Sequence, residues 1–348
     1  MASRRGFVAT CAAMVVFGSN AVGQFAVGET SSVTRLDLAK IDRQRILAGA
    51  ATALGRSPTP NSRAASDAFL EMTLDVPVLA AASQIDSDNV AKYGAKAAAL
   101  LEAWFGIAGQ KSSFQLEISG FEDLLGLSAL AEVAVSLPFL PLPTEEISGA
   151  KAWFATYLKF LTTNREALLA RDAKDRHGAS WLLQVAAFAR LAGDDLITEE
   201  CRKRFRHATL RAEMNADGHF PGDLHTPDPF RNSLMHLDAL AGVCVLLSTR
   251  FESMWDAELQ DGTGMRAAVA RHVPYMARPE TWPYPADAEG FHVLPGRRPV
   301  LAFSARAYAQ PEYAALFMKL AEPVDPKLLR AFPIRQPLLW ASQPRHRE

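Results

Sequence analysis

The chain is a succession of segments in which apolar residues recur every three or four positions, separated by short loops rich in Pro, Gly and Asp. This spacing places the apolar side chains on one face of a helix. No run shows the alternation or the β-branched content that is typical of a strand. The pattern predicts helices over Leu36–Gly55, Val76–Ser83, Asn89–Phe105, Phe121–Ser136, Glu145–Thr163, Ala179–Leu191, Thr198–Met214, Ser233–Ser248, Met265–Val273, Val300–Tyr308 and Glu312–Leu320. The sequence therefore predicts a large all-α domain.

The stretch from Asp172 to Gly193 begins with a charged loop and continues as one of these amphipathic helices. Gly193 ends the helix, as expected of a C-cap. Arg176 and His177 stand where the loop enters the helix. Backbone N–H groups lack intrahelical partners there and the helix dipole is positive, so this position favours an anionic substrate group.

Composition and charge exclude a strongly basic nucleic-acid-binding protein. The chain of 348 residues has 37 Lys and Arg against 38 Asp and Glu, so we expect no nucleic-acid partner. After loss of Cys11 with the N-terminal segment, Cys201 and Cys244 remain. They can form one disulfide or stay as buried thiols, and we favour thiols because no spacing rule links them. No metal-ligand spacing is present, so we expect no metal and no cofactor.

The first residues have the pattern of an export signal. Arg4 and Arg5 precede an apolar run of small residues that ends at Val22 and Gly23. This pattern resembles a twin-arginine signal and predicts a signal peptide over residues 1–23, a flexible segment over 24–34, and a periplasmic or secreted mature protein. The alternative is a membrane anchor, but polar and glycine residues leave the run too short to span. We expect no membrane-crossing segment after signal cleavage.

The stretch that begins at Asp175 also resembles a known family. Asp175-Arg176-His177-Gly178, followed by Gln184-Val185-Ala186-Ala187, is similar to the alginate lyase family, in which Asn-Asn-His-Gly opens a helix containing Gln-Val-Ala-Ala. His177 and Gly178 match, whereas Arg176 occupies the position of the family's catalytic asparagine. The resemblance extends from about Ile41 to Ala321. It implies an α/α toroid, an incomplete barrel of helical hairpins, over residues 35–322, with 323–348 as a C-terminal extension.

A second region of resemblance lies between residues 216 and 240. Aligned without gaps, Arg231 takes the position of a family histidine and Asn232 that of the catalytic tyrosine. Thr226 or Pro227 falls where the family has an arginine. The change at Asn232 is the most serious, because its amide cannot take up a proton at any ordinary pH.

Two histidines near Asn232 are further candidates for substrate binding. His225 precedes it, and His236 lies one helical turn beyond it on the same face. The alternative for His236 is a packed core residue. Trp282 and Tyr284 stand in a Trp-Pro-Tyr-Pro loop that closely resembles one in the family. They form either a platform for sugar rings or a lock on the loop geometry.

The resemblance implies β-elimination on a uronate polysaccharide. This reaction removes a proton next to a carboxylate, so it needs a base, an acid and groups that neutralise the carboxylate. We therefore expect an exported, metal-independent polysaccharide lyase acting on an anionic polysaccharide or oligosaccharide. His177 is the expected base or donor, Arg176 and Arg231 neutralise the carboxylate, and Asn232 donates a hydrogen bond. His177 and Asn232 are expected at two helix starts that meet in one groove.

Two other functions stay open. A catalytically impaired carbohydrate-binding protein retains the groove and the aromatic loop but lacks the tyrosine. A glycoside hydrolase uses a pair of carboxylates. The candidates for such a pair are Asp172, Asp175, Asp223 and Asp228.

Overall fold

The computed structural model describes residues 36–57, 66–106, 121–323 and 325–343. The helices are α2 (Leu38–Ile41), α3 (Arg43–Gly55), α4 (Asp67–Ser83), α5 (Val90–Phe105), α6 (Phe121–Gly126), α7 (Leu130–Ser136), α8 (Thr144–Thr163), α9 (Arg165–Arg171), α10 (Arg176–Ala192), α11 (Asp195–Arg204), α12 (Leu210–Glu213), α13 (Pro221–Leu224), α14 (Pro229–Leu247), α15 (Met265–Ala277), α16 (Pro299–Tyr308), α17 (Pro311–Lys319), α18 (Pro326–Leu329) and α19 (Pro337–Ala341). Short 3₁₀ segments include η2 (Leu127–Ala129), and a π-helical turn spans Phe205–Thr209.

The described residues contain no β-strand, and Glu258 and Gly264 form an isolated bridge. The prediction of an all-α fold is therefore confirmed. The predicted signal peptide and the segment 24–34 lie outside the described residues.

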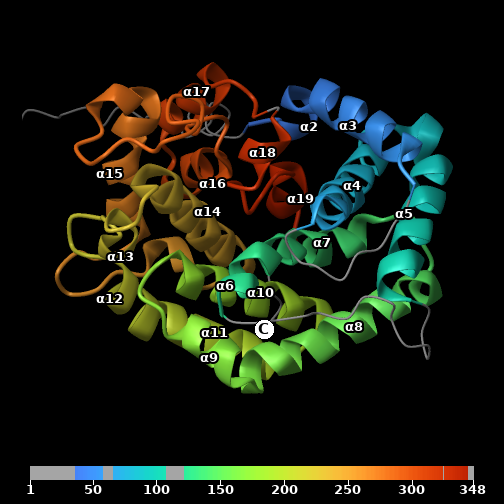
Figure 1. Ribbon diagram of the computed structural model, residues 1–348, viewed down its shortest axis with the longest axis horizontal. Coiled ribbons are helices and arrows are strands. Elements are labelled where there is room, and N and C mark those ends of the chain that lie inside the picture. Colours follow the sequence, from blue (N-terminus) through green and yellow to red (C-terminus); the bar gives the residue numbers. More distant parts are fainter. Residues whose placement is uncertain (1–35, 58–65, 107–120, 324, 344–348) are drawn as a thin grey trace, which may run out of the picture.

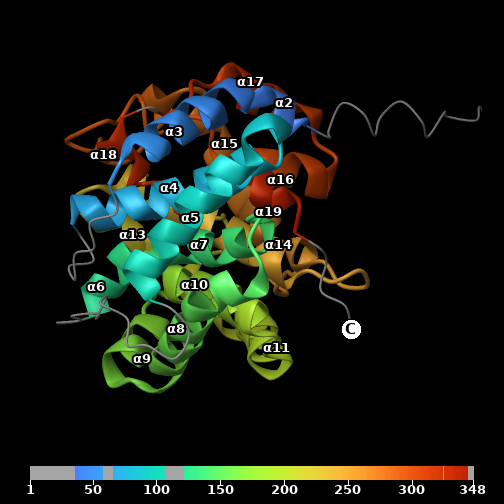
Figure 2. The same ribbon diagram turned by 90° about the vertical axis from the view of Figure 1, so that its right-hand side faces the viewer.

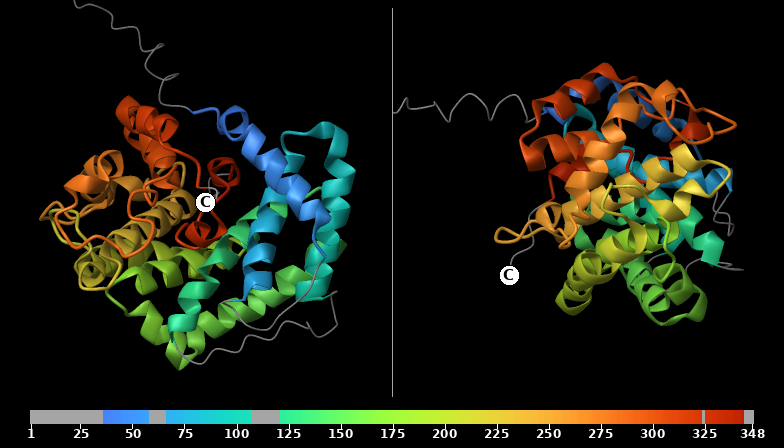
Figure 3. Two further views of the ribbon diagram at one scale, coloured as in Figure 1. Left: turned by 45° about the horizontal axis from the view of Figure 1, so that its top comes forward. Right: turned by 90° about the vertical axis from the view of Figure 1, so that its left-hand side faces the viewer.

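The helices form a curved ring of two layers (Figure 1). The inner layer follows the order α4, α7, α10, α14 and α16, and each of these helices contacts the next. The outer helices α3, α5, α8, α11 and α15 lie against them. Figure 2 shows α3, α4 and α5 stacked above α10 and α8, and Figure 3 gives the same arrangement from two other sides. The arrangement fits the expected helical toroid, since paired helices bury their apolar stripes against neighbouring pairs.

Most predicted helices begin and end close to the observed ones, and the largest difference is at α4. We predict its start at Val76, whereas it begins at Asp67. Ser66 accepts a hydrogen bond from the backbone N–H of Phe69, which is an ordinary N-cap, and Pro77 lies inside the helix. The apolar pattern also fails to predict α9, which is too short to show a period.

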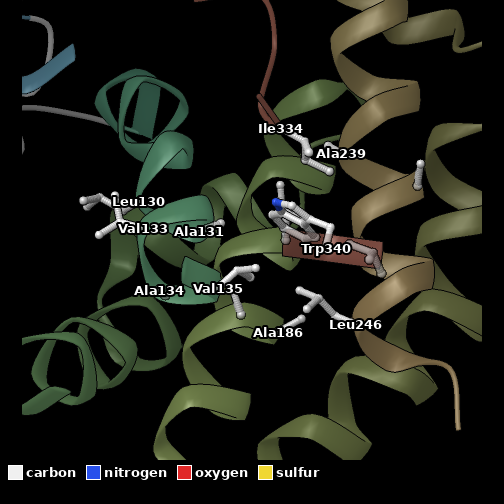
Figure 4. Close-up of a cluster of buried hydrophobic side chains, with 14 of the residues drawn as sticks. Leu130, Ala131, Val133, Ala134, Val135, Ala186, Ala239, Leu246, Ile334 and Trp340 are labelled. Carbon is white, nitrogen blue, oxygen red and sulfur yellow. The ribbon is translucent and has the colours of Figure 1, made fainter. Parts of the chain in front are cut away.

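The residues near the C-terminus are part of the core. Trp340 of α19 is fully buried and lies with Ile334 among side chains of α7, α10 and α14 (Figure 4). Buried Glu132 of α7 accepts hydrogen bonds of 2.6 Å from the backbone N–H groups of Arg335 and Gln336. The segment that the sequence suggests as an extension thus closes the toroid.

Helix α14 is apolar and 19 residues long, which is enough to cross a membrane by length and composition alone. The expectation of no membrane-crossing segment after signal cleavage therefore stays a prediction, which the burial of α14 does not contradict. In its most apolar window, 83% of the residues are buried inside the protein, as expected of a core helix. Cys201 and Cys244 are free and buried, as we favour from the sequence, and burial raises the pKa of Cys201 to about 12.

Candidate active site

The start of α10 holds a histidine against a carboxylate. Asp175 is the N-cap, and its Oδ1 accepts a hydrogen bond of 3.0 Å from the backbone N–H of His177. The same oxygen lies 2.8 Å from Nδ1 of the His177 ring, and the side chain of His177 is only 4% exposed. One aspartate therefore fixes both the helix start and the orientation of the imidazole.

The charge of Asp175 sets the tautomer of His177. Burial by itself would raise the pKa of Asp175, but the hydrogen bonds from His177 and the charges of His177 and Arg176 lower it to about 2. An ionised carboxylate accepts hydrogen bonds and donates none. Nδ1 of His177 therefore carries a proton and donates it to Asp175.

Arg176 is engaged with a buried carboxylate. Its backbone N–H donates to Oδ1 of Asp223 at 3.3 Å, and its Nη1 lies 3.4 Å from the same oxygen. Asp223 belongs to α13 and is fully buried. We expect unpaired N–H groups at this helix start, and that expectation is wrong: Asp175 and Asp223 already accept from the first two residues of α10.

His236 lies between two buried carboxylates. Its Nδ1 is 2.7 Å from Oδ2 of Asp223 and its Nε2 is 2.8 Å from Oε2 of Glu213, at the end of α12. Its exposed fraction is 0%. Burial by itself would lower the pKa of His236, but the hydrogen bonds and charges of Asp223 and Glu213 raise it to about 9. With both ring nitrogens occupied, His236 has a packed, structural role in place of the substrate contact that the sequence suggests.

Glycines allow the helix starts to approach each other. A Cβ atom on Gly178 would lie 2.4 Å from Oε1 of Glu213, and one on Gly222 would lie 2.4 Å from the carbonyl oxygen of Lys174. Distances this short exclude a side chain. The close approach lets α12 and α13 bring Glu213 and Asp223 to the first turn of α10.

Asn232 joins the same cluster from the first turn of α14. Its Nδ2 donates to Oγ1 of Thr226 at 2.8 Å, and the Thr226 hydroxyl donates to the backbone carbonyl of Asp223 at 2.6 Å. Asp223 in turn contacts Arg176. The structure thus links the starts of α10 and α14 through α13, and Arg176, His177, Asn232 and His236 belong to one region.

Arg231 faces a different loop. The backbone N–H groups of Phe230 and Arg231 donate to the two carboxylate oxygens of Asp287, at 3.0 and 2.7 Å. Nη2 of Arg231 donates to the carbonyl of Glu289 at 3.0 Å, and Nη1 lies 3.6 Å from Asp228. The start of α14 is therefore also occupied by a carboxylate of the protein, contrary to the expected unpaired N–H groups.

The aromatic loop packs beside the start of α14. Trp282 is 7% exposed and its ring centroid lies 4.9 Å from that of Phe230 and 5.1 Å from that of Tyr284. Tyr284 is half-buried and packs edge-on against His219. This burial favours a structural role for Trp282 and leaves Tyr284 as the accessible part of the platform. His225, the remaining candidate, is exposed after α13.

Three carboxylates bind the two helix starts or His236, and the sequence analysis assigns this role to none of them. Glu213 and Asp287 carry no local signal, because their partners are 23 and 56 to 57 residues away. Asp223 is considered only as a hydrolase carboxylate. Asp223 stands shortly before the helix that holds Asn232, and this position is a weak sequence signal that its carboxylate caps another helix.

Comparisons with known proteins agree on one family. The family model described as Alginate lyase matches residues 49–282. Among solved structures, the crystal structure of an alginate lyase from Bacteroides ovatus matches with a TM-score of 0.71. The match covers 86% of this chain and 94% of that chain at 19% sequence identity, so it demonstrates the fold alone. A search among curated proteins finds no match.

Proposed function

The chain belongs to the alginate lyase family of polysaccharide lyases, and from this premise we propose that it is an exported enzyme that cleaves a uronate-containing polysaccharide by β-elimination. The observation that carries the proposal is the pair formed by Asp175 and His177 at the start of α10. His177 is the residue that matches the family histidine, and because Asp175 holds its Nδ1, we assign the role of the base to Nε2.

In the proposed reaction His177 Nε2 removes the proton from the carbon next to the uronate carboxylate. The electron pair left behind forms the double bond to the neighbouring carbon, and the bond from that carbon to the glycosidic oxygen breaks. The leaving oxygen takes a proton from protonated His177 or from water. Asn232 is limited to hydrogen bonding, because its amide is neither a base nor an acid at ordinary pH.

We assign neutralisation of the substrate carboxylate mainly to Arg231. Its side chain is 27% exposed and its ion pair with Asp228 is long, at 3.6 Å. The side chain of Arg176 is 15% exposed and its guanidinium adjoins fully buried Asp223, so its charge is already matched. Arg176 therefore serves chiefly to hold α13 against α10.

The proposal predicts a new ultraviolet absorbance when the purified protein is mixed with alginate or another uronan, because β-elimination leaves an unsaturated uronate. The measurement is a time course of this absorbance together with an assay of reducing ends. A rise of both supports the lyase. Reducing ends without the absorbance would instead identify a hydrolase.

The binding-protein alternative rests on Asn232, which stands where the family has its catalytic tyrosine and donates to Thr226. Saturable binding of a uronan without new absorbance would select it. The hydrolase alternative loses support, because its candidate carboxylates are engaged: Asp172 with Arg171 and Arg204, Asp175 with His177, Asp223 with His236, and Asp228 with Arg231.

Export is part of the proposal and rests on Arg4 and Arg5 with the apolar run that follows. Replacing both arginines with lysine is expected to leave the uncleaved precursor in the cytoplasm, since a twin-arginine signal is read as a pair. Cell fractionation and the size of the protein measure this result. The matched control is Arg35→Lys, after the predicted signal. Unchanged delivery of the mature protein by the double variant would rule out this route.

A further inference from the structure

Glu213, His236 and Asp223 form a row of charged side chains in the core, and none of the three is more than 2% exposed. Nε2 of His236 lies 2.8 Å from Oε2 of Glu213, and its Nδ1 lies 2.7 Å from Oδ2 of Asp223. An imidazole donates to carboxylates on both of its sides only when both ring nitrogens carry a proton. The row is therefore complete only while His236 is protonated.

The two carboxylates of this row lie on the first turn of α10. Oδ1 of Asp223 accepts from the backbone N–H of Arg176 at 3.3 Å. Oε1 of Glu213 lies against Gly178, where a Cβ atom would approach it to 2.4 Å. Arg176 and Gly178 are the residues directly before and after His177. The row therefore fixes the backbone of the proposed base from both sides.

The aromatic neighbours of His236 favour its protonated form. Its ring stacks on that of Phe220, with the ring centroids 4.0 Å apart and an interplanar angle of 14°, and a cation is favoured over an aromatic face. His272 of α15 stacks on the ring of Phe220 as well. Burial lowers the pKa of His272 to about 4, so this histidine is neutral and adds no competing charge.

Arginines from two other helices contribute to the charge balance of the row. Arg176 of α10 pairs with Asp223 at 3.4 Å. Burial raises the pKa of Glu213, and the charges of His236 and of Arg204, at the end of α11, oppose this rise. The two carboxylates thus face positive charges from α10, α11 and α14, of which only that of His236 lies between them.

We propose that protonated His236 is a positioning residue for the reaction, which keeps Glu213 and Asp223 on the first turn of α10 and so holds the ring of His177 in its working orientation. This role rests on the proposed function and deepens it. Loss of the proton leaves one of the two carboxylates without its N–H donor, because a neutral imidazole carries a single N–H. The turn that holds His177 then loosens, and turnover falls.

The first test is the pH dependence of kcat, with alginate as the probe. Burial by itself would lower the pKa of His236, but the two carboxylates raise it to about 9, so we expect the rate to fall with a midpoint near this pH. Glu213→Gln keeps the size and one acceptor oxygen but removes a negative charge beside His236. It should move the alkaline midpoint down by about 1–3 pH units. Glu200→Gln, at an exposed residue of α11, is the matched control and should leave the midpoint in place.

The second test does not require turnover. The protein is prepared with isotope-labelled histidine, and the signals of His177 are assigned from their loss in His177→Gln. We expect the ring signals of His177 to shift in two steps, its own titration and a second step that coincides with the histidine titrating near pH 9. In Glu213→Gln the second step should move to lower pH together with that histidine. If Glu213→Gln does not fold, the His177 signals of the native protein decide the question.

The two tests separate the positioning role from the proposed function. If the native protein cleaves alginate, but folded Glu213→Gln keeps the native midpoint and His177 titrates in a single step, the positioning role fails and the lyase stands. If no uronan is cleaved while the His177 signals follow His236, the proposed function fails and the control of His177 by His236 stands.

Discussion

Replacing His177 with alanine is expected to lower the turnover of a uronate polysaccharide by about 10²–10⁴-fold, the usual contribution of a general base or acid. The loss should lie near the upper end, because Asn232 stands in the place of a second proton-transferring residue and cannot replace His177. The measurement is the initial rate of formation of unsaturated product. Because the rate constant for chemistry is affected more than ground-state binding, kcat should fall more than KM rises.

Two further variants separate catalysis from folding. Asp175→Asn keeps the size of the cap but removes the charge that sets the His177 tautomer, so it is expected to give an intermediate loss of turnover. His207→Ala, at an exposed histidine of the π-helical turn, should leave the rate unchanged. A folded His177→Ala protein with full activity would end the assignment of His177 as the base.

Replacing His236 with leucine is expected to lower the free energy of unfolding by about 3–5 kcal/mol, the usual cost of removing one partner from a buried charged pair. The variant leaves buried Glu213 without its histidine partner and leaves buried Asp223 with only the longer ion pair to Arg176, at 3.4 Å. Chemical denaturation measures the loss. His272 supplies the matched control, because it is equally buried but its Nδ1 bonds a backbone carbonyl, that of Ala268, in place of a carboxylate. Its replacement by leucine should cost about 1–2 kcal/mol.

The same cluster predicts how stability depends on pH. The pKa of His236 is raised from 6.5 to about 9 in the folded protein, so its contribution is complete below pH 6.5 and is lost as the pH rises through about 9. Burial raises the pKa of Glu213 as well, which acts in the same direction. The native protein should therefore lose stability between pH 6.5 and 9 more steeply than His236→Leu. Parallel pH profiles for the two proteins would contradict the buried charged cluster.

The sequence alone reveals the resemblance to the family, but it does not reveal which side chains contact each other in the site. Asp175, Gly178 and the Gln184–Ala187 segment lie in one continuous stretch, so their order and spacing are visible without a structure. The roles of Arg176 and His236 are different. Each depends on Asp223, which is 47 residues from Arg176 and 13 from His236 in the chain. No periodic pattern records such a contact.

By itself, the sequence determined the helices and the ends of several of them, because helix formation depends on near neighbours. The apolar period of α10 and the left-handed Gly193 at its end are local features, and the structure has both. Only the tertiary structure decided which groups meet at the helix starts. Asp223 and Asp287 occupy N–H groups that the sequence suggests are open to substrate, and both arrive from other segments of the ring. Pairing across 40 to 60 residues is set by how helices pack, since burial and hydrogen-bond partners belong to the assembled core and not to any one segment.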